Sequence, residues 1–382
     1  MQLDAPWLTR PATQAVCAAL TDAGFQALFV GGCVRNALIN VPVDDIDIAT
    51  DATPDRVIEL AENAGLRAVP TGIDHGTITV VSDHIPHEIT TFRRDVETTG
   101  RHAVVAFSGD VMDDAKRRDF TMNALYCDPA GRVIDPLNGL PDLQARRVRF
   151  IEDANQRIAE DYLRILRFFR FHAWYGDAAQ GLDAEGLAAV ATHTDGLQQL
   201  SRERVWSELC KLLTALDPAP SVAAMRAAGV LACILNGADD TGLAPLIHLE
   251  GLTDTRPDPI RRMAVLGGNP DALRLSKVQS RQLEHLRDGM GSIQQPHELG
   301  YRLGAAMARD ILLLRAAQMG QMMDPAALDM AQQGANARFP VAAADLMPAY
   351  TGAALGAKLS ALEQAWITSH FTLTKTELLT QI

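Results

Sequence analysis

Near residue 155 the chain changes character, and this change most limits the folds open to it. Before that point, β-branched runs such as Thr77–Val81 and Glu88–Phe92 alternate with short helical patterns, and both runs predict strands. After it, Ala, Leu, Arg, Met and Gln recur at helical spacing. The segment Asp135–Leu143, with two prolines and a glycine, predicts a connector. The sequence therefore predicts an α/β head followed by an all-helical remainder.

The bulk composition fits several folded domains in a reducing compartment. With 382 residues, 47% of them hydrophobic, the chain is long enough for two or three domains with real cores. No signal peptide and no run of about 18 apolar residues is present, so we expect no membrane partner. The five cysteines are scattered and form no CxxC pair, which favours reduced thiols in the cytoplasm over a disulfide framework or a zinc site. A net charge of −12 weighs mildly against nucleic-acid binding, although a local basic strip is compatible with it.

Two carboxylates, Asp45 and Asp47, lie in a run of Val, Ile and Ala that predicts a strand. Residues two apart on a strand point to the same face, so these acids project together. Like charges this close repel, and Mg²⁺, which takes one or two carboxylates plus substrate phosphates, is their natural partner. A solvated strand edge stays an open alternative for the two acids alone.

A Gly-Gly pair lies upstream of these acids and precedes a short helical pattern. Gly31 and Gly32 would let the backbone approach a phosphate, and Arg35 would add a charge-assisted contact. A plain tight turn explains the glycines equally well. The pair together with the acids indicates a metal–nucleotide site. Glu88, on the strand HEITTF, is a candidate third acid or an ordinary exposed residue.

A second cluster, KRRDFTMNAL, spans residues 116–125. Here Arg118 could contact phosphates, and Asp119 or Asn123 could bond a sugar hydroxyl. The alternatives are surface charges and, for Asp119, the N-cap of a helix. Spacing alone leaves both interpretations open.

A third cluster, RIAEDYLRILRFFRF, spans residues 157–171 and predicts a packed helix. Asp161 and Arg164 are three apart and would be neighbours on its surface, with Arg167 and Arg170 continuing by threes. An internal salt bridge with a solvated basic flank is one interpretation. The other is base selection: Asp accepts and Arg donates, so the pair could take the exocyclic amines of cytosine and adenine and reject guanine and uracil.

In this order the clusters resemble the class II tRNA nucleotidyltransferase and bacterial poly(A) polymerase family. The resemblance covers about residues 25–210 and is carried by the stretches GGCVRN…DDIDIAT, EITTFRRD, GRHAVVAFSGD…DDAKRRDFTMNAL, DPLNGLPDL, EDYLRILRFFRF and SRERVWSEL. It implies an α+β fold: a polymerase-β-like nucleotidyltransferase head with a mixed sheet, followed by an all-α neck, body and tail. The implied domains are the head at 1–140, the base-recognition neck at 141–210, and the body and tail, with tRNA binding, at 211–382.

The same resemblance implies roles for individual residues. Asp45 and Asp47 match metal-binding carboxylates for two Mg²⁺ ions, with Glu88 beside them. Residues of the Gly-Gly segment and of the second cluster match phosphate and ribose contacts: Gly31, Gly32, Arg35, Arg118, Asp119 and Asn123. Residues of the third cluster match base and nucleotide recognition: Asp161, Arg164, Arg167 and Arg170. The connector matches a hinge, and Ser201–Leu209 matches a segment that braces the neck helix. One letter departs from the family, which usually has Asp where this chain has Asn36.

The implied activity is template-independent addition of CCA, from CTP and ATP, to the 3′ end of tRNA. Poly(A) polymerase, CC-only and A-only enzymes are the alternatives within the family. The C-terminal stretch Tyr350–Ile382 has only two lysines, and the whole chain is acidic, which favours CCA addition over a poly(A) polymerase with a basic extension. The loop expected at Arg93–Asp114 has full length, which argues against a CC-only enzyme. An RNA-binding protein with a degenerate head is disfavoured by the intact acids, and a small-molecule nucleotidyltransferase would not need the neck motif.

Overall fold

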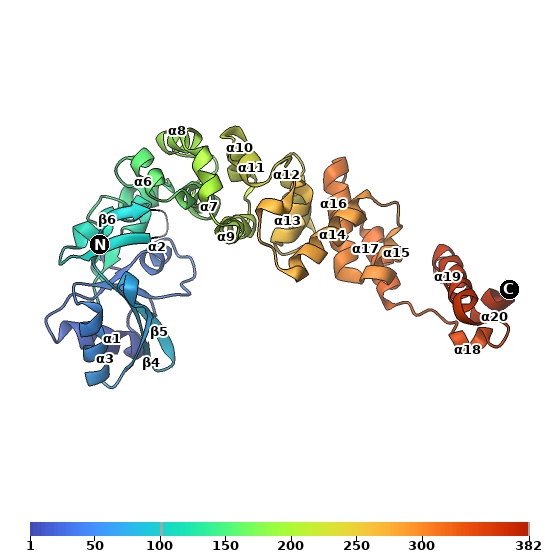
Figure 1. The fold of residues 1–382 in the computed structure, drawn as a ribbon, viewed down its shortest axis with the longest axis horizontal. Helices are drawn as coiled ribbons and strands as arrows, with labels where there is room; N and C mark the ends of the chain where they lie inside the picture. Colours follow the sequence, from blue (N-terminus) through green and yellow to red (C-terminus); the bar gives the residue numbers. More distant parts are fainter. Residues whose placement is uncertain (100–101, 381–382) are drawn as a thin grey trace. The chain divides into compact units, whose positions relative to one another are not determined.

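The structure, a computed structural model, describes residues 1–99 and 102–380. By its packing the chain divides into two compact units, Met1–Ile234 and Leu235–Ile382. The first unit holds a mixed sheet and the helices that follow it, and the described part of the second is helical (Figure 1). The predicted fold class is therefore confirmed. The domain boundaries at residues 140 and 210 stay predictions.

A seven-stranded sheet forms the centre of the head. Its order is β3-β4-β5-β2-β1-β8-β9, and β2 runs parallel to β5 while the other neighbours are antiparallel. The two β-branched runs of the sequence lie almost wholly in β4 and β5, as predicted. A separate antiparallel pair of strands, β6 and β7, follows β5 where a loop was expected. The strands are β1 Leu28–Val30, β2 Asp47–Thr50, β3 Arg67–Gly72, β4 Thr77–Ser82, β5 Ile85–Thr91, β6 Arg93–Thr99, β7 His102–Phe107, β8 Tyr126–Cys127 and β9 Val133–Ile134.

Short helices surround this sheet. Helices α1 and α3 pack against each other and against β4 and β5, and α2 follows β1 directly (Figure 1). Both α1 and α3 begin with proline, whose missing N–H costs nothing in the first turn of a helix. The head helices are α1 Pro11–Thr21, α2 Gly32–Leu38, α3 Pro54–Asn63, α4 Val111–Lys116 and α5 Leu140–Gln144, with 3₁₀ turns η1 Ile73–His75 and η2 Thr121–Asn123.

The connector predicted at Asp135–Leu143 is only partly irregular. Helix α5 starts at Leu140, so the last four residues of the connector are helical. The carboxylate of Asp135 accepts the N–H groups of Gly139 and Leu140, and Pro141 suits the first turn. Two prolines therefore mark a helix start here as well as a turn.

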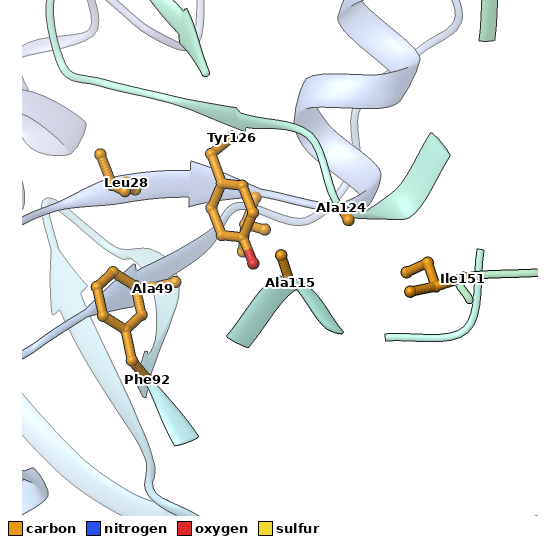
Figure 2. Close-up of a cluster of buried hydrophobic side chains, with 8 residues drawn as sticks. Leu28, Ala49, Phe92, Ala115, Ala124, Tyr126 and Ile151 are labelled. Carbon is orange, nitrogen blue, oxygen red and sulfur yellow. The ribbon is translucent and has the colours of Figure 1, made fainter. Parts of the chain in front are cut away.

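A buried cluster joins the sheet to α4 and to the chain leaving the head. Figure 2 shows the Tyr126 ring of β8 pointing toward Ala115 of α4, and Leu28 of β1 and Ala49 of β2 belong to the same cluster. Phe92 lies on the same cluster and has no exposed surface. Full burial of such a side chain is worth roughly 1.5–3 kcal/mol. This packing fixes α4 against the strands and so fixes the residues that follow α4.

The helices after the head continue the first unit. Helix α9 packs on α7, and α10 packs on α7 as well. Phe168 of α7 stacks on Phe150, with ring centroids 5.3 Å apart, and both rings contact Phe120 of the head. This aromatic core holds α7 against the head. The helices are α6 Ala154–Glu160, α7 Leu163–Tyr175, α8 Ala184–Thr192, α9 Arg202–Leu213, α10 Ala219–Ala227 and α11 Val230–Ile234, with η3 Thr194–Gln199.

The helices of the second unit pack around buried apolar side chains and a buried ionic network. Arg261 pairs with Glu250 and Asp310, and Arg262 pairs with Glu250, all inside the unit. A cluster around Trp366 packs the last helices. No helix in residues 1–99 or 102–380 combines the length and apolarity that a bilayer span requires. The helices are α12 Leu243–Leu252, α13 Pro259–Leu266, α14 Lys277–Gly291, α15 Pro296–Leu303, α16 Ala305–Met319, α17 Pro325–Asn336, α18 Ala343–Leu346, α19 Gly352–Thr368 and α20 Lys375–Thr380, with η4 Pro270–Ala272.

Candidate active site

A polar cleft of about 580 Å³ lies in the first unit, and we refer to it as the main cleft. Every site residue named from the sequence except Glu88 lines it, together with one residue that the sequence reasoning missed, Phe171. The lining residues come from α2 and β2 with the residues just before each, from the segment after α4, and from α7 with Asp161 before it, so the first and the last of these segments are more than a hundred residues apart in the chain. They are Gly31, Gly32, Arg35, Asp45, Asp47, Arg118, Asp119, Asn123, Asp161, Arg164, Arg167, Arg170 and Phe171.

The two acids of the DxD motif lie at the start of β2. The strand begins at Asp47, so Asp45 is in the extended segment before it and not in the strand as predicted. The expected alternation holds nevertheless: Ile46 and Ile48 are buried, Asp47 is half-buried and Asp45 is exposed. The apolar residues anchor the segment in the core, and the acids are left on the side of the cleft.

Glu88 lies directly beside Asp47, although it does not line the main cleft. The two residues are paired in register across the parallel strands β2 and β5. Burial, with the charge of Glu88 adding to it, raises the pKa of Asp47 to about 6, while Arg118 acts in the opposite direction. The predicted third acid is therefore adjacent to the pair, on the neighbouring strand.

The donor set of these acids fits a hard divalent cation that also binds substrate. Within residues 1–99 and 102–380, no three Asp, Glu, His or Cys side chains are grouped closely enough to hold an ion by themselves. Mg²⁺ commonly takes only one or two carboxylates and completes its shell with water and substrate phosphates. Asp45 and Asp47, which share one cleft, match that pattern.

The glycine pair leaves room between α2 and the second cluster. Gly31 has φ of +70°, a conformation that L residues with a Cβ rarely adopt. A Cβ at Gly31 would also lie 3.3 Å from Nη1 of Arg118. The position therefore requires glycine, and the missing side chain leaves the space between this backbone and Arg118 free.

Arg35 is a buried cation whose hydrogen-bond partners are all neutral. Its guanidinium donates to the side-chain oxygens of Asn36 and Asn123 and to the hydroxyl of Tyr175, 2.8 Å away. It also lies over the Tyr175 ring at 4.0 Å. Burial lowers the pKa of Arg35, and the opposing effects of Tyr175 and Asp119 do not offset it, since no carboxylate hydrogen-bonds to Arg35 within the part of the chain that the structure describes. Asn36, itself held by the carbonyl of Pro42, thus orients the arginine without neutralising it.

The carboxylate of Asp114 holds the two arginines of the second cluster, and the sequence analysis did not identify this residue. Its fully buried carboxylate accepts from Arg117 at 2.7 Å, from Arg118 at 2.9 Å and from the Tyr126 hydroxyl at 2.7 Å. Burial alone would raise the pKa of Asp114, but the two arginines outweigh it and lower the value to about 2. Arg118 is therefore fixed in orientation where it borders the cleft.

Asp119 connects the head to helix α7. One carboxylate oxygen accepts from Asn123 and from the N–H of Phe120, and the other accepts from Arg167. Burial works against its charge, yet Arg167 and Asn123 lower the pKa of Asp119 to about 2. The N-cap role that the sequence left open for Asp119 is not found, since only a 3₁₀ turn follows and its N-cap is Phe120.

The third cluster is not one continuous helix. Helix α6 ends at Glu160, Asp161 is extended at φ −153°, and α7 starts at Leu163. Asp161 accepts from the N–H of Leu163, a local bond that competes with helical pairing. The expected single helix is therefore wrong, although the Arg164 N–H donates to the carbonyl of Asp161 at 2.9 Å and both residues line the cleft.

The two residues are held by separate partners. Asp161 pairs with Arg204 of α9 at 2.7 Å, and Arg164 pairs with Glu160 at 2.5 Å. Neither ion pair joins Asp161 to Arg164, so the internal salt bridge considered from the sequence is not formed. Both side chains instead line the main cleft, an acceptor held by Arg204 and a donor held by Glu160.

Helix α7 is braced by α9, as the resemblance implied for Ser201–Leu209. Ser201 caps α9, and Glu208 accepts from Arg170 at 2.5 Å. The buried ring of Phe171 lies under three guanidinium groups, those of Arg35, Arg167 and Arg170, at 4.6 to 5.2 Å. The spacing of four between Arg167 and Phe171 is the one sequence signal that could have identified this ring.

Comparison with known proteins agrees with the resemblance stated from the motifs. Residues 27–149 match the family model described as "Poly A polymerase head domain". Residues 182–241 match the family model described as "Probable RNA and SrmB- binding site of polymerase A".

Among curated proteins, the human mitochondrial CCA tRNA nucleotidyltransferase 1 is 47% identical over 184 residues, which are 48% of this chain and 42% of the human protein. The CCA-adding enzyme of Streptococcus pneumoniae is 41% identical over 198 residues, 51% of this chain and 48% of that enzyme. The aligned part thus spans less than half the length of these relatives.

Solved structures show the same fold over nearly the whole chain. The Bacillus stearothermophilus CCA-adding enzyme in complex with CTP aligns with a TM-score of 0.73 at 24% identity, covering 94% of each chain. The Thermotoga maritima CCA-adding enzyme complexed with tRNA aligns at 0.68 and 16% identity, covering 96% of this chain and 92% of that one. At these identities the likeness establishes the fold.

Proposed function

We propose that this chain, which belongs to the class II tRNA nucleotidyltransferase and bacterial poly(A) polymerase family, adds CCA to the 3′ end of tRNA from CTP and ATP without a nucleic-acid template. One observation carries the proposal. A single cleft is lined by the acids of the DxD motif, by cations suited to a triphosphate and by the Asp161–Arg164 pair suited to a base. The relatives named as CCA-adding enzymes with CTP, ATP and tRNA support these substrates.

A divalent metal requirement follows from membership of this nucleotidyltransferase family. We propose Mg²⁺, two ions, with Asp45 and Asp47 as the protein ligands. The chemistry that such ions supply is a lower pKa for an attacking hydroxyl and neutralisation of charge on the triphosphate. The raised pKa of Asp47 supports this assignment, since a nearby cation would favour the ionised form of the carboxylate.

Arg35 and Arg118 are proposed to bind the triphosphate. Arg118 is preoriented by Asp114, and Arg35 keeps an uncompensated charge because its partners are neutral. An anionic ligand would gain charge-assisted hydrogen bonds from both. Asp119 and Asn123, which bond each other beside Arg167, are proposed to contact the ribose.

Base choice is proposed to come from Asp161 and Arg164. Cytosine and adenine offer an amine to the carboxylate and a ring nitrogen to the guanidinium, whereas guanine and uracil present a carbonyl to the carboxylate. Arg204 and Glu160 hold the two side chains in place. Because neither side chain is a nucleic-acid template, selection by this pair is template-independent.

In the proposed reaction, the 3′-hydroxyl oxygen of tRNA forms a bond to the α-phosphorus of the nucleoside triphosphate. The bond from that phosphorus to the bridging oxygen breaks, pyrophosphate leaves, and the hydroxyl proton passes to solvent. The chain contributes positioning and charge stabilisation, as in phosphoryl transfer generally.

Three tRNA substrates test the proposal: one ending before CCA, one ending at C and one ending at CC. With Mg²⁺, CCA addition predicts CTP incorporation on the first two and ATP incorporation on the third. If only ATP is incorporated, and only on the tRNA ending at CC, the enzyme is an A-only adding enzyme. If long A tracts are added, the enzyme is a poly(A) polymerase. Asp45→Asn should abolish both incorporations while the matched surface variant Glu62→Gln keeps them. Retained turnover by Asp45→Asn would refute the metal assignment.

Cytoplasmic location stays a prediction, because the vertebrate relatives are named as mitochondrial proteins. The proposed chemistry is the same in either compartment. Fractionation with a compartment marker would decide between them.

A further inference from the structure

A smaller polar cleft, of about 210 Å³, lies where β6, α4 and α6 come together, and we refer to it as the α4–α6 cleft. Arg94 of β6, Lys116 of α4, and Arg157 and Glu160 of α6 are among its lining residues. None of the residues that line it also lines the main cleft. The α4–α6 cleft is therefore a separate site, to which the proposed reaction assigns no task.

Cations outnumber acids in the α4–α6 cleft. Four cationic side chains line it together with the carboxylates of Asp113 and Glu160, which leaves an excess of two positive charges in a chain whose net charge is −12. Both carboxylates already have donors: Asp113 accepts from the Ser108 hydroxyl at 2.6 Å, and Glu160 accepts from two arginines. Such a local excess of one sign attracts an oppositely charged ligand. The cations are Arg94, Lys116, Arg117 and Arg157.

Two of these cations can take a new acceptor at little cost. Arg94 is exposed and makes no ion pair with the part of the chain that the structure describes. Lys116 is half exposed and pairs at 3.3 Å with Glu152, which is half exposed as well. Exposed pairs of this kind are weak. An anion in the cleft would therefore displace little when it binds to these two side chains.

The α4–α6 cleft adjoins the residue proposed to read the base. The guanidinium of Arg164 donates to the carboxylate of Glu160 at 2.5 Å. It also donates to the carbonyl oxygens of Arg157, at 2.7 Å, and of Arg117, at 3.1 Å. All three acceptors belong to residues that line the α4–α6 cleft, whereas Arg164 itself lines the main cleft. The orientation of Arg164 thus depends on residues that a ligand of the smaller cleft would contact.

Arg157 connects the two clefts. Its guanidinium donates to the carbonyl of Lys116 at 2.8 Å and to one carboxylate oxygen of Glu160, while Arg164 donates to the other oxygen. The carboxylate of Glu160 is therefore fixed from both sides. A ligand that draws Arg157 away would leave Glu160 held by Arg164 alone, so the position of Arg164 would be less well defined.

A small inorganic phosphate anion suits the α4–α6 cleft. Guanidinium and ammonium groups make strong, charge-assisted hydrogen bonds to phosphate oxygens. Because the donors come from three elements, an anion with oxygens in several directions fits better than a planar carboxylate. The cleft has less than half the volume of the main cleft, which favours a group smaller than a nucleoside triphosphate. The proposed reaction itself releases pyrophosphate at every turnover, so an anion of this class is supplied by the same protein.

We propose that the α4–α6 cleft binds inorganic phosphate or pyrophosphate, and that the bound anion loosens the hold on Arg164 and so lowers base discrimination. This inference rests on the proposed function, because it assigns a regulatory site to the proposed base recognition. The anion accepts from Arg94, Lys116 and Arg157. It thereby competes with Glu160 for Arg157, and Glu160 loses the partner that fixes one of its oxygens. Accumulated product then makes the choice of nucleotide less strict.

Equilibrium dialysis with radiolabelled inorganic phosphate tests binding without turnover. CTP and Mg²⁺ are present and tRNA is absent, so the main cleft is occupied. Arg94→Gln and Lys116→Gln should each raise the Kd for phosphate about tenfold, which corresponds to the loss of one charge-assisted hydrogen bond. Their calorimetric Kd for CTP should stay within twofold of wild type. Arg67→Gln, an exposed arginine on β3, is the matched control and should change neither constant. The same Kd for phosphate in wild type and all three variants would overturn the site.

The ratio of kcat/KM for CTP to kcat/KM for UTP tests the effect on Arg164. Phosphate that merely competes in the main cleft affects both nucleotides alike and leaves this ratio unchanged. On tRNA ending before CCA, near-saturating phosphate should lower the wild-type ratio several-fold. Arg94→Gln at the same phosphate concentration should keep its ratio, and potassium chloride of equal ionic strength is the control for salt. An unchanged wild-type ratio would overturn the regulatory role.

A backbone phosphate of RNA is another source of the same chemistry, and tRNA binding distinguishes it. If Arg94→Gln weakens the salt dependence of tRNA binding and leaves the Kd for free phosphate unchanged, the cleft is an RNA contact and the proposal is overturned. The two proposals also fail separately. If the wild-type protein adds nothing to any tRNA, the proposed function is refuted, while dialysis still decides whether the cleft binds phosphate. If the wild type is active and the variants bind phosphate normally, only the anion site is refuted.

Discussion

The buried carboxylate of Asp114 offers the sharpest test of how the site is held together. Asp114→Asn keeps the shape of the side chain and removes the charge that pairs with Arg117 and Arg118. The side-chain oxygen of the asparagine can still accept from one arginine or from Tyr126. Its NH₂ group, however, replaces the second carboxylate oxygen and faces another hydrogen-bond donor. Two partly exposed arginines are left with an incomplete partner at a carboxylate position that solvent does not reach.

The structure gives the size of the effect. Lowering the pKa of Asp114 from 3.8 to about 2 corresponds to about 2 kcal/mol of stability from its ionised form. Breaking a buried ion pair outright costs about 3–5 kcal/mol, and the retained hydrogen bond keeps this substitution near the lower end. We therefore expect Asp114→Asn to destabilise the head by about 2–3 kcal/mol.

Hydrogen exchange followed by mass spectrometry can measure this locally, in peptides that cover β1 and β8. A loss of about 2 kcal/mol raises their opening constant roughly 30-fold. CTP affinity should fall about tenfold as well, because Arg118 loses its fixed orientation. Glu62→Gln, an exposed acid of α3, serves as control. Protection within twofold of wild type in Asp114→Asn would refute the reasoning.

Three further outcomes follow from the same site. Arg204→Ala frees the Asp161 carboxylate, so misincorporation of UTP and GTP should rise several-fold at an unchanged Kd for tRNA; unchanged base discrimination would contradict the role of this pair. The pKa of Asp119 is lowered in the folded state, so its ionised carboxylate contributes about 2 kcal/mol of stability. This stability is complete above pH 4 and is lost as the pH falls toward 2. Asp119→Asn should lack this acid dependence in unfolding measurements. Gly139→Ala would place a Cβ 2.2 Å from the carbonyl oxygen of Thr121, so its melting temperature should drop by several degrees, and an unchanged value would contradict this close approach of the two backbones.

Local patterns were sufficient for strands β4 and β5 and for the alternation before β2, but not for the β6–β7 pair or for the break between α6 and α7. The alternation Asp45, Ile46, Asp47, Ile48 follows from strand geometry and needs no tertiary information. The same pattern could not fix where β2 begins, because strand ends depend on pairing partners. Pairing with β5 starts only at Asp47.

Partners of the charged residues could not be predicted in the same way. Asp161 looked like a helical neighbour of Arg164, but its ion pair is with Arg204, which lies 43 residues away in the chain. Arg35 depends on Tyr175, 140 residues away. A single sequence carries no signal for such pairings, because any arginine of the neck could have served. The side-chain oxygen of Asn36 accepts from Arg35, a contact that the sequence alone does not indicate.

One end of helix α7 carries a residue proposed to recognise the base, and the other end contacts an arginine proposed to bind the triphosphate. Arg164 is in its first turn, and Tyr175, which holds Arg35, is its last residue, about 17 Å away along the axis. A rigid rod transmits any rotation to both ends. A change that reorients the base-reading end to suit a different nucleotide will therefore disturb the triphosphate end, so specificity and catalytic rate in this protein should be difficult to alter independently.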